Sequence, residues 1–122
     1  MQRRNRLSRS RDFDTVYRKG RSASTRFLVL HWFPREAETD TEGSRLGLAV
    51  PRSVGGAVVR NRVKRRLRET WRELAGRAQP GFDYVLVARP ALAEPAETRG
   101  QEWLRERVAE VLEKAAQTKA GP

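Results

Sequence analysis

The sequence predicts a single α/β (α+β) domain whose elements follow the order α-β-β-α-β-α. Apolar runs of strand length alternate with longer helical patterns, and glycine or proline stands at most of the junctions between them. The 122 residues suffice for one modest hydrophobic core. We therefore expect one domain over 1–122, with a basic arm at 1–9 and a frayed tail at 117–122.

The first expected element is a helix over 11–19. Ser10 suits its N-cap, and Gly20 is a favourable residue for its end. Phe13 and Tyr17 lie four residues apart and so share one face of this helix. On the pattern alone, both aromatic side chains are core residues.

Two strands are expected next, with a shorter one possible around 20–24. RFLVLHWF (26–33) is rich in β-formers, and SRLGLAVP (44–51) alternates polar and apolar residues. The connection at 35–43 is polar and acidic. The simplest arrangement across so short a loop is an antiparallel hairpin.

The second helix is expected over 57–75, after a turn that contains Gly55 and Gly56. Its apolar residues collect on one side of a helical wheel, and its cations collect opposite. FDYVLVAR (82–89) then predicts a buried strand. General rules make such a strand–helix–strand crossover right-handed.

The C-terminal part predicts a loop at 90–97 and a last helix. Thr98 and Gln101 resemble a capping box for that helix. Its apolar stripe consists of Leu104, Val108, Val111, Leu112 and Ala115.

The composition favours a polyanionic partner. The chain carries 26 Lys and Arg against 15 Asp and Glu, a net charge of +11, and 20 of these cations lie in 1–82. There is no cysteine, which excludes disulfides and Cys-based metal sites. The apolar run at 27–33 is too short to span a bilayer, and no signal peptide is recognisable, so we expect a cytoplasmic protein.

The strongest local signal is the cationic run in the second helix. Six of the nine positions from 60 to 68 are Arg or Lys, and the run contains no acid before Glu69. Like charges at this spacing repel, whereas an ordinary solvated face mixes signs. Phosphates of a nucleic acid would convert the repulsion into attraction through counterion release.

No catalytic constellation accompanies this charge. The chain has one His and no Cys, and it lacks the motifs of metalloproteases, nucleotide-binding loops and dinucleotide sites. The acids within 36–42 could hold a hard cation loosely, although a solubilising loop is the more typical role. We expect no catalytic residue, no metal site and no small-molecule substrate.

The run from Ala57 to Glu69 (AVVRNRVKRRLRE) resembles the RNR signature of the bacterial ribonuclease P protein component. The RNRL opening from Arg4, the strand pair and the DYVLVAR strand occur in the same order as in that family. The resemblance covers nearly the whole chain. It implies an α-β-β-β-α-β-α two-layer sandwich, like domain 2 of ribosomal protein S5, with an unusual left-handed β-α-β crossover.

The resemblance also implies a function and its site residues. The family is the protein subunit of a ribozyme that removes the 5′ leader of precursor tRNA with Mg²⁺ held mainly by RNA. Catalytic-RNA contacts are implied at Arg60, Asn61, Arg62, Lys64, Arg65 and Arg68. A cleft for the single-stranded leader is implied at Phe13, Tyr17 and His31. The nearby cations Arg9 and Arg11 would supply phosphate contacts beside it. The loop at 35–43 is implied as a possible metal-binding segment.

Three other functions compete with this interpretation. A structural RNA-binding protein, such as a ribosomal component, would share the charge but need no leader cleft. A helix-turn-helix DNA-binding module would need two close helices around a short turn, whereas a strand pair precedes the basic helix here. A stand-alone nuclease would need the catalytic residues that the sequence lacks.

Overall fold

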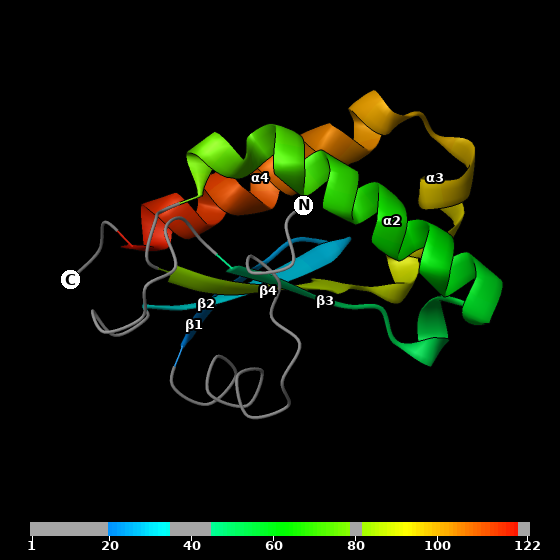
Figure 1. The fold of residues 1–122 in the computed structure, drawn as a ribbon, viewed down its shortest axis with the longest axis horizontal. Coiled ribbons are helices and arrows are strands. Elements are labelled where there is room, and N and C mark those ends of the chain that lie inside the picture. The colour runs from blue at the N-terminus through cyan, green and yellow to red at the C-terminus, as the bar shows by residue number, and fades with distance from the viewer. Residues whose placement is uncertain (1–19, 35–44, 79–81, 120–122) are drawn as a thin grey trace.

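The computed structural model describes residues 20–34, 45–78 and 82–119. They form a four-stranded sheet with two long helices on one face (Figure 1). The strands are β1 (Arg21–Ser24), β2 (Leu28–Pro34), β3 (Arg45–Ala49) and β4 (Phe82–Ala88). The α-helices are α2 (Ala57–Leu74), α3 (Ala93–Thr98) and α4 (Gln101–Lys119), and the 3-10 turns are η2 (Arg52–Val54), η3 (Ala75–Arg77) and η4 (Pro90–Leu92). The helix expected over 11–19 and the loop at 35–43 lie outside the described residues.

The strand order is β1-β2-β4-β3, so the predicted hairpin is wrong. Strand β4 separates β2 from β3, pairing antiparallel with β2 and parallel with β3. The physical reason is burial. Five of the seven residues of β4 are buried, and the centre of a sheet gives such an apolar strand neighbours on both sides. The short β3 is left at an edge, where fewer of its residues are enclosed.

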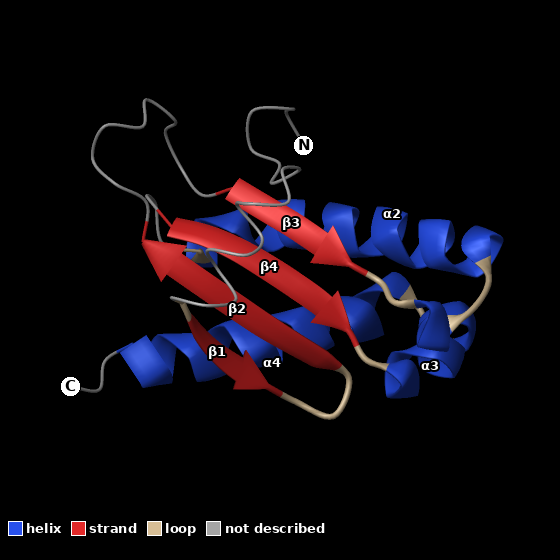
Figure 2. Ribbon diagram, turned by 90° about the horizontal axis from the view of Figure 1, so that it is seen from below, coloured by secondary structure: helices blue, strands red, loops and turns tan. Residues whose placement is uncertain are grey.

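The β3–α2–β4 crossover is left-handed. Figure 2 views the sheet with α2 and α4 behind it, and the parallel strands β3 and β4 lie side by side in front. In this view both strands point to the right, and β4 lies below β3. The chain leaves β3, returns behind the sheet along α2 and enters β4, and this arrangement is a left-handed crossover. The general preference predicted the opposite hand. The hand implied by the family resemblance is the one observed.

The core fills the space between the sheet and the two long helices. Leu28, Leu30 and Trp32 of β2 point into it, together with Tyr84 and Leu86 of β4. The predicted stripe of α4 is confirmed, since all five of its residues are buried. The predicted apolar side of α2 is also confirmed, with these residues buried or packed against the core: Val59, Val63, Leu67, Thr70, Trp71 and Leu74.

The segment before α4 differs from the prediction. Residues 90–97 form η4 and most of α3 rather than a loop. Thr98 is the last residue of α3, and its Oγ1 donates to the carbonyl of Glu94, 3.0 Å away. The predicted capping box is therefore wrong. Helix α4 extends to Lys119, so the first three residues of the expected tail are helical.

Candidate RNA interface

Helix α2 is anchored to the core on one side and exposes some of its cations on the other. Leu67 and Trp71 are 0% and 1% exposed and anchor the helix to the core, where the Trp71 ring lies 5.2 Å from the ring of Tyr84. These two anchors lie four residues apart and so share one face of the helix. The opposite face therefore points away from the core. The fold therefore leaves Arg62, Arg65 and Arg72 of this helix exposed.

The six predicted RNA-contacting residues all lie in α2 but differ in exposure. Asn61, Arg62 and Arg65 are exposed. Arg60, Lys64 and Arg68 are partly buried. The structure thus brings all six residues onto one continuous element.

Arg62 already has an acidic neighbour. Its Nη2 lies 3.3 Å from Oε1 of Glu97 in α3, and the two side chains are 53% and 36% exposed. Arg65, one turn further along, makes no ion pair with any of the residues that the structure describes. Arg62 therefore has an ion-pair partner within the protein, whereas Arg65 has none among the described residues.

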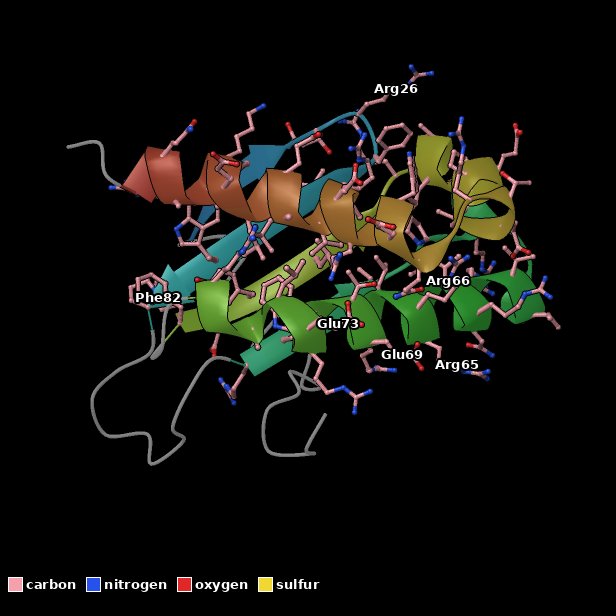
Figure 3. The ribbon with its side chains drawn as sticks, turned by 90° about the horizontal axis from the view of Figure 1, so that it is seen from above. Arg26, Arg65, Arg66, Glu69, Glu73 and Phe82 are labelled. Carbon is pink, nitrogen blue, oxygen red and sulfur yellow. The ribbon has the colours of Figure 1, made fainter. Side chains whose placement is uncertain are left out.

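Arg66 forms hydrogen bonds within the protein through all three of its guanidinium nitrogens. Its Nε donates to Oε1 of Gln101 at 3.2 Å, Nη2 donates to the carbonyl of Arg99 at 3.0 Å, and Nη1 donates to the carbonyl of Ala96. Figure 3 shows Arg66 directed from α2 toward α3, with Arg65 on the other side of the helix. Arg66 is a structural residue that sequence reasoning did not separate from the basic run. Its position four residues before buried Thr70 was the available signal.

The turn before α2 permits a close approach at Gly55. A Cβ at this residue would lie 2.9 Å from Cγ1 of Val59. A larger residue would push against the first turn of the helix. Gly55 thus serves the packing of the turn on α2, whereas a Cβ at Gly56 would meet nothing within 4 Å.

His31 lies on the face of the sheet opposite the core. It is paired between Ser22 of β1 and Val85 of β4, while its neighbour Trp32 is buried on the core side. Val85 packs with Phe33 on the same face. Burial lowers the pKa of the His31 imidazole below its ordinary value, because desolvation penalises the charged form. His31 is therefore neutral near pH 7.

The other four predicted leader-cleft residues, Phe13, Tyr17, Arg9 and Arg11, lie outside the described residues. The acidic stretch within 36–42 does as well. In the part of the chain that is described, no three His, Cys, Asp or Glu side chains gather to hold a metal ion. None of the helices in that part is both long enough and apolar enough to cross a membrane.

The family model described as Ribonuclease P matches residues 1–116 of the chain. The chain belongs to the ribonuclease P protein family. The ribonuclease P protein component of Shouchella clausii is 37% identical over 115 residues, covering 94% of this chain and 88% of that protein. The corresponding protein of a Bacillus cereus strain is 36% identical over 94 residues, covering 77% of this chain and 79% of its own length.

Solved structures of ribonuclease P proteins share the fold. The protein from Thermotoga maritima superposes with a TM-score of 0.77 at 33% identity, over 88% of this chain and 94% of that one. The protein from Staphylococcus aureus gives a TM-score of 0.75 at 28% identity, over 91% and 94% of the two chains. As a ribonuclease P protein, the chain is a subunit of an endoribonuclease of tRNA processing whose catalysis belongs to RNA.

Proposed function

We propose that this ribonuclease P subunit grips the catalytic RNA through the cationic side of α2. The observation that carries the proposal is a single helix with Leu67 and Trp71 locked in the core on one side and Arg62 and Arg65 exposed on the other. Exposed cations on one rigid helix can neutralise successive phosphates of an RNA backbone. The proposed contacts are Arg60, Asn61, Arg62, Lys64, Arg65 and Arg68.

The proposed site for the 5′ leader of precursor tRNA is the sheet face that carries His31. A neutral imidazole that is partly exposed beside β1 and β4 suits stacking with an unpaired base. Phe13, Tyr17, Arg9 and Arg11 are the sequence-predicted partners of His31 in this cleft. A stacking platform with basic neighbours would bind a single strand with little sequence preference, as leaders of varied sequence require.

In this proposal the protein positions RNA and does not cut it. The sequence offers no nucleophile with a base, and the RNA would hold the Mg²⁺ ions that activate water. The protein would lower the electrostatic cost of bringing two polyanions together. Its partners would be the catalytic RNA and precursor tRNA in the cytoplasm, with no membrane and no small-molecule substrate.

A reconstitution assay at low Mg²⁺ tests the catalytic-RNA site. The cognate catalytic RNA with wild-type protein should remove the leader of precursor tRNA faster than the RNA alone. Replacing Arg60, Arg62 and Arg65 together by Ala should abolish that acceleration. With about six phosphates engaged, log K for wild type should fall against log salt with a slope of about −4 to −5, and the triple variant should lose about 2–3 of it.

A matched control removes the same charge elsewhere. Arg77, Arg99 and Arg105 are exposed cations outside α2, and their replacement by Ala should leave most of the acceleration and of the salt slope. Equal losses in the two triple variants would overturn the α2 site. No acceleration by wild type, despite tight RNA binding, would favour a structural RNA-binding protein instead.

A separate experiment tests the leader site. His31→Ala should weaken binding of a precursor with a multi-nucleotide leader about fivefold, equivalent to about 1 kcal/mol for one lost stacking contact. Binding of mature tRNA to the same holoenzyme should stay unchanged. Equal weakening for both substrates would show that His31 acts on the holoenzyme as a whole rather than on the leader.

A further inference from the structure

The connector between α3 and α4 is fastened to α2 by a hydrogen-bonded clamp. Arg66 donates from all three of its guanidinium nitrogens, to Ala96 of α3, to Arg99 of the connector and to Gln101, the first residue of α4. In return, Nε2 of Gln101 donates to the carbonyl of Arg66 at 3.2 Å and to Oγ1 of Thr70. Planar, forked donors lose little freedom when they bind several acceptors, so this clamp holds the connector in one position.

The clamp matters because α3 is too short to hold its own place. It has six residues, includes Pro95 and starts without a side-chain cap. Isolated helices of this length are unstable in water. Its position beside α2 therefore depends on the contacts at its C-terminal end, where Arg66 binds the carbonyls of Ala96 and Arg99.

Glu97 stands between these two clamped carbonyls in the chain, and it is directed at Arg62. The carboxylate Oε1 lies 3.3 Å from Nη2 of Arg62, which precedes Arg66 by four residues on α2. An acid held against a helix that binds phosphates is unexpected, because it cancels charge that RNA binding would use. Its oxygens present to Arg62 the same negative charge and acceptor geometry as a phosphate.

We propose that Glu97 is an intramolecular competitor of RNA for Arg62. In the unbound protein the carboxylate occupies the guanidinium, and an RNA phosphate has to displace it before Arg62 contributes to binding. Arg65, which has no such partner among the described residues, is available at once. The inference rests on the proposed function of α2 and adds a device that weakens one of its contacts.

The effect on affinity should be modest. Both side chains are partly exposed, so water and salt screen the pair. Removing the competing charge should tighten binding of the catalytic RNA about two- to fivefold, the range expected for one exposed ion pair. In wild type, Arg62→Gln should weaken binding less than Arg65→Gln does.

The test measures equilibrium binding of the labelled cognate catalytic RNA in moderate salt. Glu97→Gln should tighten binding two- to fivefold. The matched control is Glu94→Gln, which removes the same charge from an exposed position of the same helix without touching Arg62. It should tighten binding by less than about 1.5-fold, because long-range charge effects are screened.

A double-mutant cycle makes the assignment specific. Glu97→Gln should give no gain when Arg62 is already Gln, and Arg62→Gln should cost more when Glu97 is Gln. Urea unfolding of each variant establishes that it is folded. Equal gains from Glu97→Gln and Glu94→Gln, or a gain that persists without Arg62, would overturn the proposal.

Failure of this inference is distinguishable from failure of the function on which it rests. If replacing Arg60, Arg62 and Arg65 together leaves RNA binding unchanged, α2 is not the interface. If that variant loses binding while Glu97→Gln changes nothing, α2 binds RNA and only the competitor role is wrong.

Discussion

Arg45 and Asp83 face each other across the parallel strands β3 and β4 and form a bidentate ion pair. Nε of Arg45 lies 2.8 Å from Oδ1 of Asp83, and Nη2 lies 2.7 Å from Oδ2. The side chains are 22% and 8% exposed. This ion pair fastens the edge strand β3 to the sheet.

Loss of this pair should destabilise the protein. Asp83→Ala leaves a largely enclosed guanidinium without its carboxylate, and we expect the free energy of unfolding in urea to fall by about 2–3 kcal/mol. Glu110→Ala is the control, because its carboxylate is 50% exposed and lies 3.8 Å from Arg107 in a longer ion pair. That change should cost less than about 0.5 kcal/mol. Similar costs for both would contradict a special role for Asp83.

The clamp formed by Arg66 and Gln101, which fastens the connector between α3 and α4 to α2, should contribute measurably to stability. Gln101→Leu removes one acceptor and two donor interactions, including the bond that Oγ1 of buried Thr70 accepts. We expect a loss of about 2 kcal/mol in urea unfolding. Gln117→Leu, at an exposed position of the same helix, is the control and should change stability by less than about 0.5 kcal/mol. A cost for Gln101→Leu no greater than the control's would argue against the clamp.

The buried residues that anchor α2 to the core should contribute strongly to the stability of the protein. Leu67 is 0% exposed, and Leu67→Ala should lower the free energy of unfolding by about 3 kcal/mol through lost burial and a cavity. Val58, in the same helix, is 69% exposed, so Val58→Ala should change stability by less than about 0.5 kcal/mol. Thermal or urea unfolding of the two variants measures this difference directly.

Acid should destabilise the protein partly through His31. Its pKa is lowered in the folded state by burial, so between the ordinary value of 6.5 and the folded value the unfolded chain binds more protons. The stability contribution is therefore complete above pH 6.5 and is lost as the pH falls through the folded pKa. His31→Gln should remove this part of the pH dependence.

The measurement for His31 is unusually direct. It is the one histidine of the chain, so a single imidazole signal in an NMR titration reports its pKa without an assignment problem. We expect a midpoint below 6.5 in the folded protein. A midpoint at or above 6.5, or an unchanged pH profile of stability in His31→Gln, would contradict the burial argument.

Local patterns were sufficient for the four strands, for α2 and α4 and for the polarity of their faces, but not for α3. The apolar residues of α2 and α4 recur with helical period, and the alternation in β2 separates Trp32 from His31, because successive side chains of a strand point to opposite faces. The RNR segment likewise identified the family from the chain alone. These features depend on residues only a few positions apart in the chain, for which helix or strand geometry fixes the side chains that share a face.

The pairing of strands could not be read in the same way. The short acidic loop favoured a hairpin, but β4, whose residues are mostly buried, lies between β2 and β3, and the crossover is left-handed. The last capping box failed for a similar reason. Gln101 gains more from the buried Thr70 and from Arg66 than from the end of its own helix. Strand pairing and side-chain hydrogen bonds of this kind depend on which residues, distant in the sequence, are buried next to one another in the fold.

The sequence by itself determined a basic, amphipathic helix of a ribonuclease P protein and the residue types with which it would meet RNA. The tertiary structure decided how those cations are divided. Arg66 is drawn to the carbonyls of α3, Arg45 to Asp83 and Arg62 to Glu97, while Arg65 stays exposed. The physical reason is that each guanidinium binds the acceptors that the fold brings within reach, and those acceptors lie some 30 residues or more away in the chain.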